Sequence, residues 1–234
     1  MVFLNWLTKI AGALFVLLLL AGVPALSYAT ARRPELRTVP RRDLYFSAVI
    51  SQWLLTAVGV VVALAGGPGL QATGFRAVPL RDFYFWVALL AAVSLAGLGL
   101  VLVLERRNWW PPESDLVLLL IPASRREQFL AVLMVAPTAA LCEEFLYRGY
   151  LLTQISAWLG GHVWGWAVSS IAFGLAHAYQ GLNGMARAAI LGALLAYPVV
   201  HLGSLYPSMA AHFLIDAIAL AWLGPRFLPR PSAL

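Results

Sequence analysis

The sequence predicts an all-α fold, a polytopic transmembrane helical bundle of about seven spans. Of its 234 residues, 62% are hydrophobic and only 11% are charged, against roughly 45–50% and about 25% in soluble domains. Apolar runs recur from end to end without a polar linker, which indicates one membrane domain. The net charge of +6 is spread in loops between these runs. This distribution is a topology signal and not a nucleic-acid footprint.

A helix needs ~20 apolar residues to cross a hydrocarbon core about 30 Å thick, and several runs are close to this length. The first run has Lys9 in front and a leucine-rich middle, so a cleaved signal peptide is the alternative. Its length and its continuation into further spans favour a retained helix. The expected helical segments are 8–29, 45–66, 83–104, 128–158, 163–179, 186–202 and 205–223.

Two short features divide these segments. The stretch 116–121 is too short to span and is followed by Pro122, which indicates an interfacial or re-entrant piece before the next helix. Gly160 and Gly161 mark a tight turn between two antiparallel helices.

Loop arginines predict the orientation, because cytoplasmic loops carry an excess of positive charge. They place the N-terminus outside and the C-terminal tail, 225–234, in the cytoplasm. We expect an integral membrane protein of the bacterial inner (plasma) membrane. The arginines of the expected cytoplasmic segments are Arg32, Arg33, Arg37, Arg41, Arg42, Arg106, Arg107, Arg125, Arg126, Arg226 and Arg230.

Three of the ten acidic residues, Glu143, Glu144 and Asp216, lie inside apolar runs. An ionisable group at the bilayer centre costs about 2.5–3.5 kcal/mol even on a lenient scale, so such residues usually face a protein interior and have a function. Arg148 follows Glu144 by four residues and can pair with it on one helical face. The alternative is a buried ion pair that only joins helices. That alternative does not explain why Glu143 also lies in the apolar run.

Two histidines are placed to join these carboxylates. Glu143 precedes Gly160 by seventeen residues and His177 follows it by seventeen, so an antiparallel hairpin brings both to the same depth. A carboxylate and an imidazole facing each other can bind and deprotonate a water molecule. His212 and Asp216 are four residues apart and share a helical face. A packed core histidine remains the alternative for His177 and for His212.

The depth of His212 makes a further prediction. It lies eight residues after the expected turn at Gly203, about 12 Å along a helix. We therefore expect a cavity that opens toward the outer leaflet, with the Gly160 hairpin projecting past the membrane.

Other protease chemistries find less support. The sequence contains no His-Glu-x-x-His and no Gly-x-Ser-x-Gly motif. Ser208 precedes His212 by four residues and could form a catalytic Ser-His dyad with it. Such a dyad would give Glu143 and Glu144 no role in catalysis. Cys142 in an apolar helix is more often a packing residue than a nucleophile.

The spacing of these residues resembles a known family. Cys-Glu-Glu-Phe-Leu-Tyr-Arg-Gly-Tyr-Leu at 142–151 resembles the Glu-Glu-x-x-x-Arg motif of the CPBP intramembrane proteases, which include CAAX-processing enzymes and bacteriocin-processing or immunity proteins. Phe173-Gly-Leu-Ala-His177 resembles its Phe-x-x-x-His motif, and His212-Phe-Leu-Ile-Asp216 its third motif. The resemblance covers about 128–223. It implies a protease core at 116–224, preceded by helices 1–115 of unassigned role.

The resemblance also implies roles for the site residues. Glu143 would activate water with His177, His212 and Asp216 would complete the site and stabilise the oxyanion, and Glu144 with Arg148 would support it. The family often has Asn where this chain has Asp216. No cofactor is expected, although His177, His212 and Asp216 are a competent zinc set and the alternative.

We expect an intramembrane endopeptidase of glutamic type. Its partners would be the bilayer and a membrane-associated protein or peptide substrate, without nucleic acid. Prenylated CAAX tails, leader-bearing peptides and C-terminal sorting helices, as in the myxosortase branch, all stay open as substrates. A non-catalytic immunity or scaffold protein is the alternative, and so is a transporter that uses the same groups as a relay, although no internal repeat supports that class.

Overall fold

The described part of the chain, residues 2–111 and 114–223 of a computed structural model, is helical and contains no strand. The predicted tail at 225–234, with Arg226 and Arg230, lies outside these residues. The N-terminal part contains α1 (Val2–Leu17), the π-helix η1 (Leu18–Gly22), α2 (Val23–Ala31), the 3-10 helix η2 (Pro34–Thr38), α3 (Arg41–Ala65), α4 (Gly69–Ala72) and α5 (Leu80–Arg106).

The C-terminal part begins with a short helix and continues through a long helical run. Its elements are α6 (Asp115–Leu120), α7 (Arg125–Leu130), the π-helix η3 (Ala131–Val135), α8 (Ala136–Glu143), the π-helix η4 (Glu144–Leu151), α9 (Leu152–Leu159), α10 (His162–Ala176), the 3-10 helix η5 (Ala178–Gln180), α11 (Gly181–Leu202), α12 (Tyr206–Ile218) and the π-helix η6 (Ala219–Leu223).

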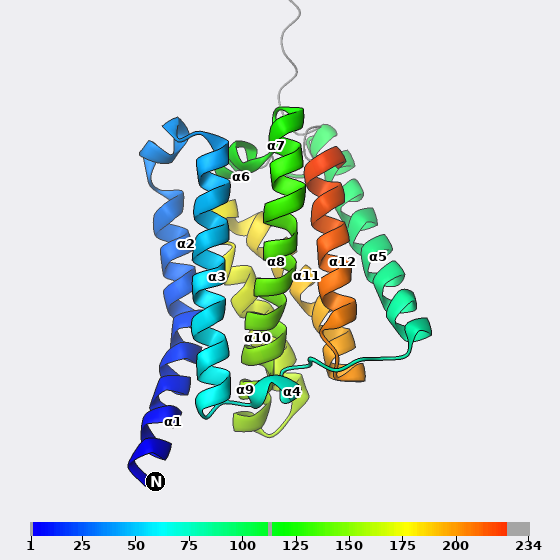
Figure 1. Cartoon of the computed structure of the whole chain (residues 1–234). Coiled ribbons are helices and arrows are strands. Elements are labelled where there is room, and N and C mark those ends of the chain that lie inside the picture. The colour runs from blue at the N-terminus through cyan, green and yellow to red at the C-terminus, as the bar shows by residue number, and fades with distance from the viewer. Residues whose placement is uncertain (1, 112–113, 224–234) are drawn as a thin grey trace, which may run out of the picture.

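These helices pass back and forth between two ends of a bundle (Figure 1). Five described helical stretches are long and apolar enough to cross a membrane: Trp6–Ala31, Arg41–Ala65, Leu80–Arg106, Arg125–Leu159 and Ala178–Leu202. The predicted all-helical, polytopic fold is therefore confirmed. The other two expected segments are also helical, but α10 has 15 residues and α12 has 13.

Local sequence explains where the helices begin and end. Pro40 and Pro79 directly precede α3 and α5, where a proline removes an N–H that a first helical turn does not use. Ser124 and Glu127 form a capping box at the start of α7. Gly160 ends α9 in the left-handed region with φ of 74°, as a tight reversal requires. The expected turn between antiparallel helices is therefore present.

The first helical stretch is packed into the bundle. Phe15 makes an edge-to-face contact with Tyr150 at 5.1 Å between ring centroids. Leu19 is fully buried, and Phe15 closely approaches Gly59 of α3. The core around Phe145 and Tyr150 thus contains side chains from α1, α3 and the long run 125–159. The N-terminal helices and the expected protease core share one interior.

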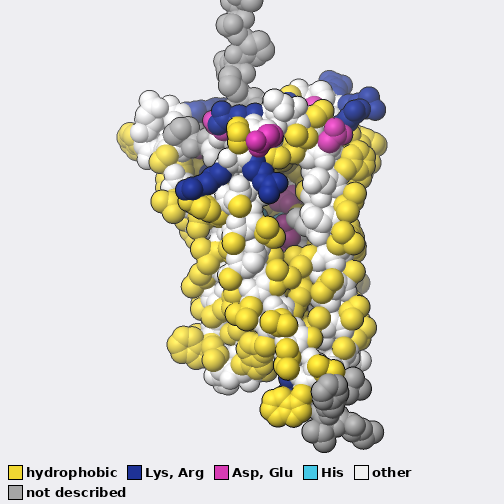
Figure 2. All heavy atoms as spheres, turned by 90° about the vertical axis from the view of Figure 1, so that its left-hand side faces the viewer, with side chains coloured by type: hydrophobic (Ala, Val, Ile, Leu, Met, Phe, Trp, Pro, Cys, Tyr) yellow, Lys and Arg dark blue, Asp and Glu magenta, His cyan; other side chains and the backbone are white. Residues whose placement is uncertain are grey.

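The outer surface matches a membrane environment. Figure 2 shows hydrophobic side chains over most of one face and Lys and Arg side chains gathered mainly at its upper end. We call this the arginine-rich end; it contains the junction of α2 and α3, the end of α5, α6 and the start of α7 (Figure 1). The short helix α6 lies here and does not span, as its length predicted. Which end faces the cytoplasm stays a prediction.

Candidate active site

The Glu-Glu-x-x-x-Arg motif lies where the long run 125–159 changes from α8 to the π-helix η4. All eight residues of η4 are buried. A π-helix bonds residue i to i+5 instead of i+4, so it widens the turn, and such segments are often found at functional sites. Residues 144 and 148 consequently project together into the bundle interior, where they form an ion pair.

The expected pair of Glu144 and Arg148 is present and completely enclosed. Arg148 Nη1 lies 3.3 Å from Glu144 Oε1, and both side chains are 0% exposed. The guanidinium also lies over the ring of Phe173, 3.9 Å from its centroid, an arrangement that stabilises a desolvated cation. Gly192 of α11 makes room for it, because a Cβ there would lie 3.2 Å from Arg148 Nη2.

His212 connects the carboxylates from the opposite helix, α12. Its Nδ1 donates to Glu144 Oε1 at 2.8 Å, which leaves Nε2 4.0 Å from Glu143 Oε2 and 3.5 Å from Asp216 Oδ2. Asp216 thus lies within ion-pair distance of His212, and the short hydrogen bond of the ring goes to Glu144. A carboxylate bonded to Nδ1 fixes which ring nitrogen faces the site.

Glu143 is the less buried of the two glutamates, with 14% of its side chain exposed. Gln52 Nε2 of α3 donates to Glu143 Oε1 at 2.8 Å. Gln52 Oε1 is buried and has no hydrogen-bond partner among the described residues. Our sequence reasoning missed Gln52, although an amide within the apolar run 45–66 is the same kind of signal as the buried acids.

His177 is close to this group but is not bonded to it. It follows the last residue of α10, and its Nδ1 lies 2.8 Å from Phe173 O. Its ring contacts Phe173 at 4.5 Å, and the ring of Phe173 contacts His212 at 6.3 Å. Within the described residues, His177 has no hydrogen bond or ion pair to Glu143 or Glu144. The structure therefore brings together Glu143, Glu144, Arg148, His212 and Asp216, while the ring of His177 packs against Phe173.

The depth of the site follows from α3. Gln52 lies eleven residues from the start of α3 at Arg41 and thirteen from its end at Ala65. The contact with Gln52 places Glu143 beside the middle of α3. The leaflet toward which the site opens stays a prediction. Acidic side chains are recessed below the apolar surface beneath the arginine-rich end (Figure 2).

The other candidates have structural surroundings. Ser208 Oγ donates to Leu195 O at 2.6 Å, so its hydroxyl is committed to the backbone and not to His212. Cys142 is fully buried and packs in the core. Among residues 2–111 and 114–223, no group of three or more His, Cys, Asp or Glu side chains has the arrangement of a metal site.

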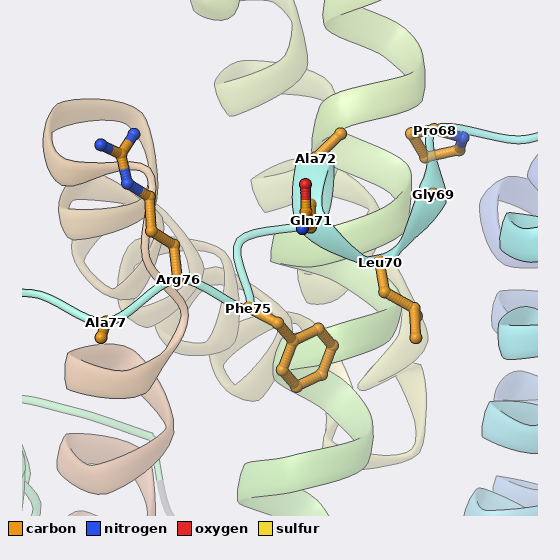
Figure 3. Close-up of a pocket in the computed structure, with 8 residues that line it drawn as sticks. All are labelled: Pro68, Gly69, Leu70, Gln71, Ala72, Phe75, Arg76 and Ala77. Carbon is orange, nitrogen blue, oxygen red and sulfur yellow. The ribbon is translucent and has the colours of Figure 1, made fainter.

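Two pockets of the structure lie away from these residues. One of about 960 Å³ is lined by eight residues between Pro68 and Ala77. Among them, Phe75 points toward the green helix of the run 125–159 and Arg76 points away from it (Figure 3). The other, of about 430 Å³, lies at the arginine-rich end. The candidate site is thus a packed polar cluster, and neither pocket contains it.

A comparison with protein families gives a match over the segment that contains the three motifs. Residues 125–218 match the family model described as type II CAAX prenyl endopeptidase Rce1-like. This match confirms the resemblance to the CAAX-processing proteases. No curated protein and no solved structure matches the chain.

Proposed function

We propose that this chain, whose residues 125–218 match the type II CAAX prenyl endopeptidase Rce1-like family, hydrolyses a peptide bond with water activated by Glu143. One observation carries the proposal. Glu143 is the glutamate that the buried ion pair does not use, and it lies between Gln52 and His212 in the interior of the bundle.

The proposed reaction follows from this arrangement. Glu143 takes a proton from water as the water oxygen attacks the scissile carbonyl carbon, and a tetrahedral oxyanion forms. His212 faces that position through Nε2 and, when protonated, donates to the oxyanion. The C–N bond then breaks, and Glu143 returns the proton to the departing amine. A low-dielectric interior strengthens each of these electrostatic interactions.

The remaining residues support these two groups. Glu144 holds His212 through Nδ1, and Arg148 compensates the charge of Glu144. Gln52 orients the carboxylate of Glu143 and keeps one oxygen free to accept a hydrogen bond. The Phe173 carbonyl accepts from His177 Nδ1, which leaves His177 Nε2 as an acceptor that can orient the water. Asp216 lies on the open side of His212, with 28% of its side chain exposed.

The proposal is tested by comparing membrane proteomes of cells that carry the wild-type chain, Glu143→Gln or Glu35→Gln. Glu35 is an exposed glutamate of η2 and gives a matched control. We expect uncleaved N- or C-terminal segments to accumulate only with Glu143→Gln. An unchanged set of termini, with a retained phenotype, would instead support a non-catalytic scaffold or immunity protein.

A further inference from the structure

The pocket at the arginine-rich end is formed by segments far apart in the sequence. It has a volume of about 430 Å³ and lies between the end of α2, η2, the start of α6 and η5. Most of its walls come from outside the family match at 125–218. Its lining residues include Tyr28, Arg32, Arg33, Arg37, Asp115 and Tyr179.

Positive charge exceeds negative charge in this pocket. Three arginines line it against one carboxylate, that of Asp115, which pairs with Arg37 at 2.7 Å. Arg32 lies over the ring of Tyr28, 4.3 Å from its centroid. The guanidinium of Arg33 has no ion pair or hydrogen bond among the described residues. Two positive charges are therefore available to an anionic group.

The surface next to the pocket is apolar and open. Tyr28 of α2 is 51% exposed, and Leu182, directly after the pocket residue Gly181, is 82% exposed. Arginines thus lie beside the ends of exposed apolar helices. This combination matches a phospholipid, whose headgroup carries the charge and whose acyl chains need apolar contacts.

We propose that this pocket binds the phosphate of an anionic phospholipid, with Arg32 and Arg33 contacting the phosphate and the acyl chains lying along Tyr28 and Leu182. A peptide carboxylate is the less suitable occupant. An extended peptide requires partners for its N–H and C=O groups along its length, and the adjacent exposed side chains are a leucine and a tyrosine.

One residue of the pocket, Tyr179, also contacts His177. Tyr179 of η5 receives a hydrogen bond at its carbonyl from Ser114 and donates from its backbone N–H to Ser27, at 3.4 and 3.1 Å. Its ring lies 5.9 Å from the ring of His177. A lipid that bridges α2 and η5 would therefore hold the segment that positions His177.

Native mass spectrometry of the full chain in nanodiscs tests the proposal. Discs contain phosphatidylcholine with or without phosphatidylglycerol, and inorganic phosphate is added in a separate arm. The Arg32→Gln/Arg33→Gln variant is compared with Arg125→Gln/Arg126→Gln, an adjacent pair of exposed arginines at the same end that does not line the pocket. Because all four arginines are exposed, both variants should fold.

We expect the wild-type chain to retain phosphatidylglycerol selectively and the Arg32/Arg33 variant to bind it about tenfold more weakly, with the Arg125/Arg126 variant unchanged. Arg33→Lys should keep most of the affinity, since it keeps the charge. Equal loss in both double variants would overturn the site in favour of a diffuse basic surface. Binding of inorganic phosphate alone, or displacement of the lipid by a peptide with a free carboxylate, would overturn the assignment to lipid.

Discussion

Two arginine–carboxylate pairs in this molecule are chemically alike but lie in opposite surroundings. Arg148 and Glu144 are 3.3 Å apart and 0% exposed, whereas Arg37 and Asp115 are 2.7 Å apart with side chains 65% and 70% exposed. The shorter pair is the weaker one for stability, because water and side-chain freedom offset its attraction. Removing one partner of the longer pair would leave an uncompensated charge in the interior. Burial, and not distance, decides what each pair does.

The largest expected effect comes from breaking the buried pair. Arg148→Met leaves Glu144 charged and enclosed, and we expect the free energy of unfolding in detergent micelles to fall by about 3–5 kcal/mol. The double variant Arg148→Met/Glu144→Gln should recover part of this loss, because it removes both charges. A single variant as stable as the wild type would contradict our interpretation of the pair.

Replacing the neighbouring glutamate separates catalysis from stability. Glu143→Gln is expected to lower the rate of substrate cleavage by about 10²–10⁴, the range for a lost general base, while the melting temperature changes little. Glu144→Gln should lower both the rate and the stability, since Glu144 bonds to Arg148 and His212. Activity of the wild type that is lost with a chelator and restored by zinc would favour a metal-dependent mechanism instead.

Gln52 tests whether the N-terminal helices contribute to the site. Removing its hydrogen bond to a charged group in Gln52→Ala should lower kcat about ten- to hundredfold with a smaller change in KM. Ser51→Ala, at an exposed position on the same helix, is the control and should behave as the wild type. A wild-type kcat in Gln52→Ala would show that Glu143 does not need this partner.

Two glycines, Gly192 and Gly97, differ in the space that surrounds them and therefore in the expected effect of an added methyl group. A Cβ at Gly192 would meet Arg148, Phe173 and Ser170 at 3.2–3.3 Å, so Gly192→Ala should destabilise the fold by about 1–3 kcal/mol. At Gly97 of α5 a Cβ meets nothing within 4 Å, and Gly97→Ala should be neutral or stabilising by up to about 1 kcal/mol. Thermal unfolding of both variants checks the difference in sign.

The smallest effect is expected at the exposed pair. Arg37→Gln should change the free energy of unfolding by only about 0–1 kcal/mol, although its ion pair is the shorter of the two. The same unfolding assay as for Arg148→Met gives the direct comparison. A loss as large as that of Arg148→Met would show that Arg37 anchors α6 to η2 more firmly than its exposure implies.

The sequence by itself determined the fold class and the residues that share a helical face. Apolar runs long enough to span a bilayer predicted helices, and these are present. The four-residue spacings of Glu144 with Arg148 and of His212 with Asp216 predicted neighbours, and both pairs lie close together. Such predictions succeed because helix geometry fixes the spacing of residues within one segment, whatever the rest of the chain does.

Only the tertiary structure decided which of these faces meet. It gave His212 a hydrogen-bond partner in Glu144 beside its helical neighbour Asp216, brought Gln52 from α3 to Glu143, and packed the ring of His177 against Phe173. It also converted Glu144–Leu151 into a π-helix, which no spacing in the sequence predicted. Contacts between helices depend on tilt, rotation and depth, and these are set by many small packing interactions distributed over the whole bundle. No single motif contains that information.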